Sequence, residues 1–161
     1  MGCVLIPWYI RHRHAVTAPI VKSFFQILRS ENPDLKIGVA GFCWGGRYAL
    51  LLGQESFSNL HLVDAVFAGY PSSLSIPKEI DSPYCPVSIA VASMDPRFTP
   101  KMAAHVEKVW KTKAEIVKNE IVVYAGAKQG FCVRGNMEND KEKEDMRKAI
   151  EQVGIQSKHD R

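Results

Sequence analysis

The pattern of hydrophobic and polar positions along this chain alternates between two kinds of segment. Short apolar runs, rich in β-branched residues, predict strands at residues 37–40, 62–68, 87–92 and 121–124. Apolar residues at helical spacing predict intervening helices at about 16–30, 44–53 and 100–110, and a charged helix closes the chain. Because strands alternate with helices, we expect an α/β fold with about four mostly parallel strands flanked by helices.

Local signals sharpen the ends of these elements. Thr17, followed by Ala18 and Pro19, resembles a helix N-cap with an early proline, and Thr99 before Pro100 predicts a second cap. Residues 72–86 are rich in serine and proline and predict a surface loop. A chain of 161 residues is long enough for one domain with a core, so we expect residues 1–161 to form a single domain.

Composition narrows the function classes. The net charge of +4 comes from basic residues interleaved with acids, and no aromatic-studded basic stripe indicates nucleic-acid binding. The apolar start lacks a basic leader and soon meets Arg11, and no segment has the length to cross a membrane. The four cysteines lack the paired spacing of a zinc site or a disulfide framework. We therefore expect a cytoplasmic protein with no metal and no cofactor.

Residues 36–50 carry the most informative motif, a β-rich run followed by Gly-x-Cys-x-Gly-Gly and a helical apolar run. This is the nucleophile-elbow pattern of α/β-hydrolases with cysteine in place of serine. We expect Gly41 and Gly45 to lack room for a Cβ atom. Cys43 would stand at a helix N-terminus, which favours a thiolate. A buried structural cysteine is the alternative, but the strand-turn-helix context favours a nucleophile.

In a parallel sheet, ligands bind at the carboxyl ends of the strands. Besides Cys43, this rule draws attention to residues 93–96, which contain Asp95, and to residues 125–131, which contain Gln129. An aspartate before a proline is also a common turn former, so Asp95 has a structural alternative to a functional role.

Three segments together resemble the dienelactone hydrolase family in its fungal form: GFCWGG, SMDPRFTP and YAGAKQGFCVRGN. The resemblance covers Ile6 to about Asn136 and implies a partial α/β-hydrolase fold. It also implies that Cys43 is the nucleophile, that Asp95 is the acid of a triad and that the Trp44 N–H binds the oxyanion. Arg134 is then expected to bind a substrate carboxylate, with an exposed loop arginine as the alternative.

Gln129 occupies the position of the family's catalytic histidine. A glutamine amide forms hydrogen bonds but does not accept a proton near neutral pH. Loss of the base of a working triad typically costs roughly 10⁴–10⁶ in rate, although a thiol depends on its base less than a hydroxyl does. We therefore expect acylation by reactive esters and impaired turnover. His12 and His14 are weak candidates for a substitute base, and His61 and His105 are weaker because of their positions.

The resemblance also implies a shortened fold, because family members carry further strands before the region that matches this chain. One consequence is the absence of the loop that supplies a second oxyanion N–H, a donor worth about 10²–10³ in rate. The other is that strand 37–40 becomes a bare apolar sheet edge, which favours pairing with a second copy of the chain.

Two main hypotheses follow, and whether the chain is an active enzyme stays open between them. In the first, Cys43 attacks a lactone, ester or thioester carbonyl, and Asp95 orients Gln129 or a recruited base. Fungal relatives of this kind act in secondary metabolism, so a polyketide-derived lactone is the expected substrate. In the second, the chain is a non-catalytic pseudoenzyme that binds a small ligand or a partner. An incomplete gene product without independent function is a third reading.

Overall fold

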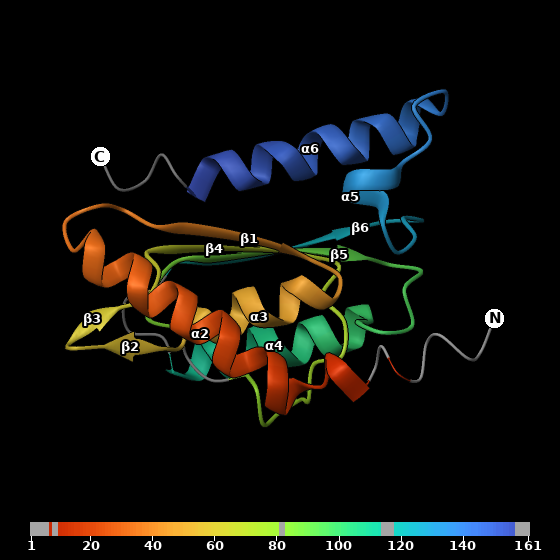
Figure 1. Cartoon of the computed structure of the whole chain (residues 1–161). Coiled ribbons are helices and arrows are strands. Elements are labelled where there is room, and N and C mark those ends of the chain that lie inside the picture. The colour runs from red at the N-terminus through yellow and green to blue at the C-terminus, as the bar shows by residue number, and fades with distance from the viewer. Residues whose placement is uncertain (1–6, 8–9, 81–82, 114–117, 157–161) are drawn as a thin grey trace. The chain divides into compact units, whose positions relative to one another are not determined.

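The computed structural model describes residues 7, 10–80, 83–113 and 118–156 (Figure 1). Contacts divide the chain into two units, residues 1–35 and residues 36–161. The first unit contains helix α2 (His14–Glu31), and the second contains the sheet and the remaining helices. The prediction of a single domain over residues 1–161 stays a prediction.

Helix α2 begins earlier than the sequence pattern predicts, with Arg13 as its N-cap instead of Thr17. The backbone N–H groups of Val16 and Thr17 both donate to the Arg13 carbonyl, at 2.9 and 3.1 Å. The first turn therefore closes before Pro19, which lies inside the helix and removes only its own N–H from the ladder. The predicted cap at Thr17 is wrong for this reason.

The main sheet has four parallel strands in the order β1 (Gly38–Phe42), β4 (Ala65–Gly69), β5 (Val87–Ala92) and β6 (Asn119–Tyr124). Helices α3 (Trp44–Leu52) and α4 (Pro100–Lys113) cover one face. The short helix α5 (Phe131–Arg134) and the long helix α6 (Asp140–Gln156) lie on the other face (Figure 1). The predicted α/β architecture, with a mostly parallel sheet flanked by helices, is confirmed.

Burial explains why the strands read as apolar runs. Every residue of β5 is buried, because this strand has a neighbour on each side and helices on both faces. Phe67 of β4 is 2% exposed and belongs to a cluster with Tyr70, Tyr124 and Phe131. Burial of one such side chain contributes about 1.5–3 kcal/mol. This cluster lies directly beneath the carboxyl ends of the strands, where the loops that carry Cys43 and Gln129 begin.

A small hairpin that the sequence pattern does not predict precedes strand β4. Its strands are β2 (Ser56–Phe57) and β3 (Leu60–His61), paired antiparallel through a two-residue turn. Ser58 and Asn59 both have positive φ, 51° and 65°, as this turn type requires. Strand β4 begins at Ala65, three residues later than the predicted strand at residues 62–68.

The serine- and proline-rich segment after β4 is fastened to helix α3. Glu79 accepts hydrogen bonds from the Arg47 guanidinium, with Nε at 3.0 Å, and both side chains are less than 15% exposed. Gln54 Nε2 also donates to the Glu79 carbonyl at 3.1 Å. In its described residues, the predicted surface loop is therefore held in place beside helix α3.

Strand β1 lies at the edge of the sheet, since no other described strand pairs with its outer side. The Cys43 N–H donates to the Gly69 carbonyl, and the Ile37 carbonyl accepts from the Asp64 N–H. Odd-numbered residues of β1 therefore direct their backbone polar groups toward β4. In a parallel ladder the alternate residues, Gly38 and Ala40 among them, direct theirs outward.

Candidate active site

Cys43 sits in a strained turn between β1 and α3. Its backbone has φ 52° and ψ −118°, a region that non-glycine residues rarely occupy. Three hydrogen bonds hold it there: its N–H donates to Gly69 at 3.0 Å, and its carbonyl accepts from Gly46 at 3.1 Å and from Ser72 at 3.0 Å. The surrounding backbone therefore fixes the conformation of Cys43, as is common where a side chain must be presented for chemistry.

The glycines around the turn have different roles. A Cβ atom on Gly41 would lie 2.3 Å from the Gly45 carbonyl oxygen, so strand and helix pack too closely for any side chain there. A Cβ on Gly46 would lie 3.1 Å from Pro71, which is tight. A Cβ on Gly45 would meet no atom within 4 Å. The prediction that Gly45 lacks room for a side chain is wrong, because only its backbone faces the strand.

Two polar side chains contact the sulfur of Cys43. Gln129 Nε2 donates to Sγ at 3.0 Å, and Ser72 Oγ lies 3.5 Å from Sγ. The sequence predicts Gln129 but not Ser72, which is buried and 4% exposed. Ser72 follows β4 at the carboxyl edge of the sheet, and this position is the feature of the sequence that could have pointed to it. The sulfur thus lies between an amide donor and a hydroxyl.

Asp95 is in the expected loop but does not contact Gln129. The residue is 2% exposed, and its Oδ1 accepts from the Arg97 N–H at 2.9 Å. Its Oδ2 is buried and has no hydrogen-bond partner in the described part of the chain. No hydrogen bond joins Asp95 Oδ2 to Gln129, whose amide nitrogen donates to Cys43, and the role of Asp95 in orienting Gln129 or a recruited base stays a prediction. An unpaired buried oxygen of this kind costs about 1–3 kcal/mol.

Three hydrogen bonds join the loop of Asp95 to the loop of Gln129. The Ser93 N–H donates to the Tyr124 carbonyl at 3.2 Å, and the Met94 N–H donates to the Ala127 carbonyl at 2.9 Å. In return, the Gly126 N–H donates to Ser93 Oγ at 2.8 Å. The positions of residues 95 and 129 are therefore coupled through backbone, whatever side chain residue 129 carries.

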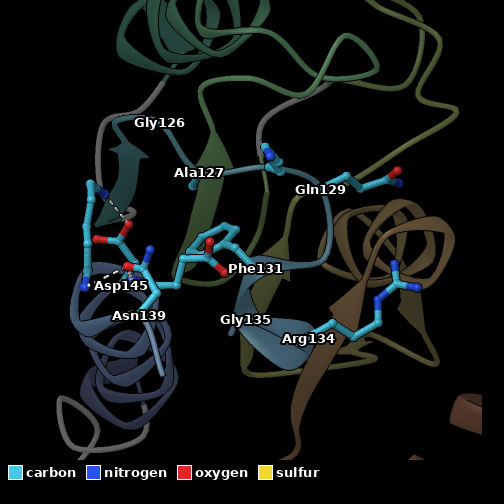
Figure 2. Close-up of a pocket in the computed structure, with 11 residues that line it drawn as sticks. Gly126, Ala127, Gln129, Phe131, Arg134, Gly135, Asn139 and Asp145 are labelled. Carbon is cyan, nitrogen blue, oxygen red and sulfur yellow. Dashed lines mark hydrogen bonds and ion pairs between the residues drawn. The ribbon is translucent and has the colours of Figure 1, made fainter. Parts of the chain in front are cut away.

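Trp44 and Arg134 lie at the ends of two helices near Cys43 and Gln129. Trp44 is the first residue of α3, and its ring packs edge-on against Tyr48 with centroids 4.9 Å apart. Arg134 ends α5 and is exposed. Figure 2 shows the side chains of Gln129 and Arg134 extending to the same side, away from Asn139 and Asp145.

A cavity of about 460 Å³ opens beside these two side chains. Its lining comes from the loop after β6, from α5 and from the start of α6 (Figure 2). On the α6 side Lys141 pairs with Asp145, and Asn139 Oδ1 accepts from backbone N–H groups of the first turn. Lys128 and Arg134 add positive charge on the other side. The acid Glu142 also lines the cavity and Cys43 is not among its lining residues, so the cavity is a polar recess of mixed charge beside Gln129 and Arg134.

The groups beneath the site stay protonated over a wide range. Burial raises the pKa of Tyr70 to about 12, with Cys132 and Cys43 adding to the rise and Arg134 opposing it. Burial also raises the pKa of the Cys132 thiol to about 12. Cys85 is buried as well, whereas Cys43 is partly exposed. Among the three described cysteines, Cys43 is thus the accessible one.

The histidines considered as substitute bases have other surroundings. His61 lies in β3 and stacks on Tyr84 at 4.8 Å, and His105 lies within α4. His12 and His14 belong to the first unit, and their recruitment stays a prediction. No cluster of three or more metal-ligating side chains occurs among the residues that the structure describes. Within the same residues, no helix is both long and apolar enough to span a membrane.

Comparison with known sequences decides the family. The dienelactone hydrolase family pattern matches residues 12–153, which include the elbow and both following loops. The chain belongs to the dienelactone hydrolase family. The predicted resemblance is confirmed, and with it membership of a hydrolase family.

Two fungal hydrolases are similar to the chain. The hydrolase tropI of Talaromyces stipitatus is 29% identical over 151 residues, which are 88% of this chain and 53% of that protein. The hydrolase pyvD of Aspergillus violaceofuscus is 25% identical over 131 residues, 81% of this chain and 50% of that protein. The chain therefore spans about half the length of the curated relatives it matches.

Solved structures support the fold of this dienelactone hydrolase family member. Esterase 2 of Thermogutta terrifontis matches with a TM-score of 0.68 over 90% of this chain and 67% of that structure. The sequence identity is 20%, so this likeness concerns the fold alone.

Proposed function

We propose that this protein is a dienelactone-hydrolase-like enzyme in which Cys43 attacks the carbonyl carbon of a lactone, ester or thioester. The observation that carries the proposal is the geometry at the sulfur. Cys43 stands in a strained elbow at the start of α3, and Gln129 Nε2 donates to its Sγ at 3.0 Å. The sulfur stands at the N-terminus of α3 with an amide N–H donor beside it, and cysteine is intrinsically strongly nucleophilic.

In this mechanism, each group near the sulfur has one role. The Cys43 thiolate adds to the carbonyl carbon, and the Trp44 N–H at the first position of α3 binds the oxyanion that forms. Arg134 and the adjoining cavity hold a carboxylate or another polar part of a small substrate. Gln129 supports the thiolate but removes no proton from water, so hydrolysis of the acyl-enzyme is slow.

The wider setting of the reaction is part of the same proposal. A role in secondary metabolism is the setting that the family resemblance predicts, and the two similar fungal proteins are themselves named hydrolases. A cytoplasmic, reducing location, as the sequence predicts, would keep Cys43 as a free thiol.

Reaction with p-nitrophenyl acetate tests the nucleophile. We expect a burst of p-nitrophenol equal to the enzyme present, followed by slow turnover, with the acetyl group on Cys43 in the intact-protein mass and peptide map. Iodoacetamide should block the burst by alkylating Cys43. The matched control is Cys132→Ala, which removes a buried thiol and should leave the burst intact. Absence of any acetyl or alkyl adduct at Cys43 in folded protein would overturn the proposal.

A non-catalytic binding role is the second candidate, and one observation favours it. Asp95 Oδ2 has no partner in the described residues, so the acid of the family's site is not engaged with residue 129. A binding protein would retain its affinity for a lactone or carboxylate ligand after Cys43→Ala and would show no acyl adduct in the wild type.

The sheet edge supports a proposal about partners. Gly38 and Ala40 of β1 direct backbone groups outward, and the segment carries no charge or proline that would block pairing. We infer that a second copy of the chain pairs with β1. Light scattering after size exclusion should show a dimer that Ala40→Pro converts to a monomer, since the proline removes an outward N–H only. A wild-type monomer at high micromolar concentration would contradict this proposal.

A further inference from the structure

We propose that this site is selective for acyl donors with thiolate leaving groups, and that it passes the acyl group to a second thiol in preference to water. The substrate class would then be thioesters, and the reaction would be acyl exchange between thiols. This inference rests on the proposed role of Cys43 as nucleophile and specifies the chemistry that its surroundings permit.

Two polar side chains touch the sulfur of Cys43. Gln129 Nε2 donates to Sγ at 3.0 Å, and Ser72 Oγ lies at 3.5 Å. An amide and a hydroxyl both form hydrogen bonds to a thiolate, and neither accepts a proton near neutral pH. Asp95 is not a substitute, because its Oδ1 accepts from the Arg97 N–H and its buried Oδ2 bonds to no described group. A general base must be within hydrogen-bond reach of the proton it removes.

Acyl transfer from a thioester to Cys43 needs no proton transfer by the protein. The Cys43 thiolate attacks a thioester carbonyl, a carbon–sulfur bond forms, and the oxyanion appears. When the intermediate collapses, the bond to the donor sulfur breaks and its electron pair leaves as a thiolate. A free thiol has a pKa near 8.5, so this leaving group needs no proton at neutral pH.

The second half-reaction mirrors the first. An acceptor thiolate attacks the acyl group on Cys43, and the Cys43 sulfur leaves with its electron pair. Gln129 Nε2–H receives the restored thiolate at the distance seen in the structure. The balance is one thioester and one thiolate consumed, one thioester and one thiolate formed, with no proton gained or lost by the protein.

Alkyl esters and lactones as donors, and water as acceptor, require a proton transfer that no side chain in contact with the Cys43 sulfur supplies. An alkoxide leaving group needs a proton as the bond breaks, and water, whose pKa lies far above neutral pH, must lose a proton as it attacks. In a complete triad the histidine does both. Such general acid–base catalysis is typically worth about 10²–10⁴ in rate. The site therefore discriminates by the basicity of the leaving group and of the acceptor.

A matched set of acetyl donors tests this inference. The donors are the acetyl thioester of N-acetylcysteamine, phenyl acetate and ethyl acetate, used with wild type, Gln129→His and Cys43→Ala, with intact-protein mass and product thioester as readouts. For each donor, the rate of Cys43 acylation in the wild type is divided by its rate in Gln129→His, which removes the intrinsic reactivity of the donor. We expect this normalised rate to be about 10²-fold or more higher for the thioester than for ethyl acetate, because only the alkoxide leaving group needs the proton that the histidine supplies.

The fate of the acetyl group gives a second, independent readout on wild type alone. A cysteamine derivative or a coenzyme-type thiol is added at millimolar concentration. We expect most of the acetyl group on Cys43 to be transferred to this thiol as a new thioester, and little of it to be released as acetate. Equal normalised rates for the three donors, or loss mainly to water, would overturn the inference and leave the nucleophile proposal standing. If no donor acylates Cys43 in folded protein, both proposals fail.

Discussion

The two halves of the candidate site differ in how completely they are built. On the elbow side, Cys43 keeps a strained backbone, three backbone hydrogen bonds and a close strand–helix crossing at Gly41. On the loop side, the backbone links between residues 93–95 and 124–127 are present, but residue 129 is a glutamine and Asp95 Oδ2 has no described partner. Backbone hydrogen bonds hold both halves in place. The halves differ at residue 129, where glutamine stands in the position of the family's proton-carrying histidine.

Acyl transfer by an enzyme has two separate requirements. Presentation of a nucleophile depends on backbone geometry, which the elbow supplies. Movement of protons depends on a single titratable group held between nucleophile and acid. In the proposed mechanism Gln129 contacts Cys43 at the place where a base would act, so the first requirement is retained without the second.

Replacement of Gln129 by histidine should produce the largest effect. The imidazole would replace the amide beside Cys43 Sγ and supply a base, with Asp95 Oδ2, which has no described partner, as its expected acceptor, so we expect ester turnover to rise by about 10²–10⁴. Steady-state kinetics with p-nitrophenyl acetate measure the gain. Asp95→Asn in the Gln129→His background should remove most of it, while Asp95→Asn alone should change little. An unchanged rate in Gln129→His would mean that the loop side lacks more than its base.

Substitutions at two glycines test the elbow side. Gly41→Ala would place a Cβ 2.3 Å from the Gly45 carbonyl oxygen, so it should lower the free energy of unfolding by roughly 2–3 kcal/mol and slow Cys43 alkylation. Gly45→Ala, the matched control, adds a Cβ in open space within α3 and should be neutral or stabilising by about 0.5–1 kcal/mol. Urea denaturation gives both values. Equal effects would contradict the packing of strand against helix at Gly41.

A buried network beneath the loop side should have a smaller effect, confined to stability. Tyr124 at the end of β6 donates to Gln152 Oε1 at 3.0 Å, and Gln152 Nε2 donates to Ser88 Oγ at 2.6 Å. Gln152→Leu removes the acceptor of the Tyr124 hydroxyl, whereas Ser88 Oγ keeps its hydrogen bond to Glu120, and the substitution should cost about 1–3 kcal/mol. Urea denaturation measures the loss. The iodoacetamide rate at Cys43 should stay within about twofold, because the elbow does not contact α6 through Gln152; a large fall in that rate would show that the two halves are coupled.

Alkaline pH should give the smallest effect per group. Burial raises the pKa values of Tyr70 and Cys132 to about 12, and it raises that of Tyr124 as well. Between about pH 9 and pH 12 the unfolded chain therefore binds fewer protons than the native state. Stability falls as pH rises through this window, by at most about 1.4 kcal/mol per pH unit for each group.

Denaturation midpoints at several alkaline pH values measure this slope. Tyr124→Phe removes one of the three groups, so its stability should decline less steeply with pH than that of the wild type. A wild-type stability that is flat from pH 9 to pH 11 would contradict the burial of these acids.

The features predicted from sequence are those that follow from local pattern. The apolar run of β5 and the Gly-x-Cys-x-Gly-Gly turn each specify their structure through neighbours close in the chain, and both are found where expected. The hairpin before β4 was missed because its turn depends on positive φ at Ser58 and Asn59, residues that also suit an ordinary loop.

The site was only partly accessible to the same reasoning. Topology places Cys43, Asp95 and Gln129 at one edge of the sheet, which the sequence predicts. Ser72 beside the sulfur and the preference of Gln129 for Cys43 over Asp95 depend on side-chain packing across elements far apart in sequence. Such contacts have no local signature, and neither does the open space at Gly45.

The hydrogen bonds that join the loop after β5 to the loop after β6 also bear on how the protein can change over generations. They hold position 129 in place independently of its side chain, so a substitution there arrives in a prepared setting. Glutamine and histidine codons differ at one base. A population carrying this gene is thus a single point mutation away from a site with an imidazole beside Cys43.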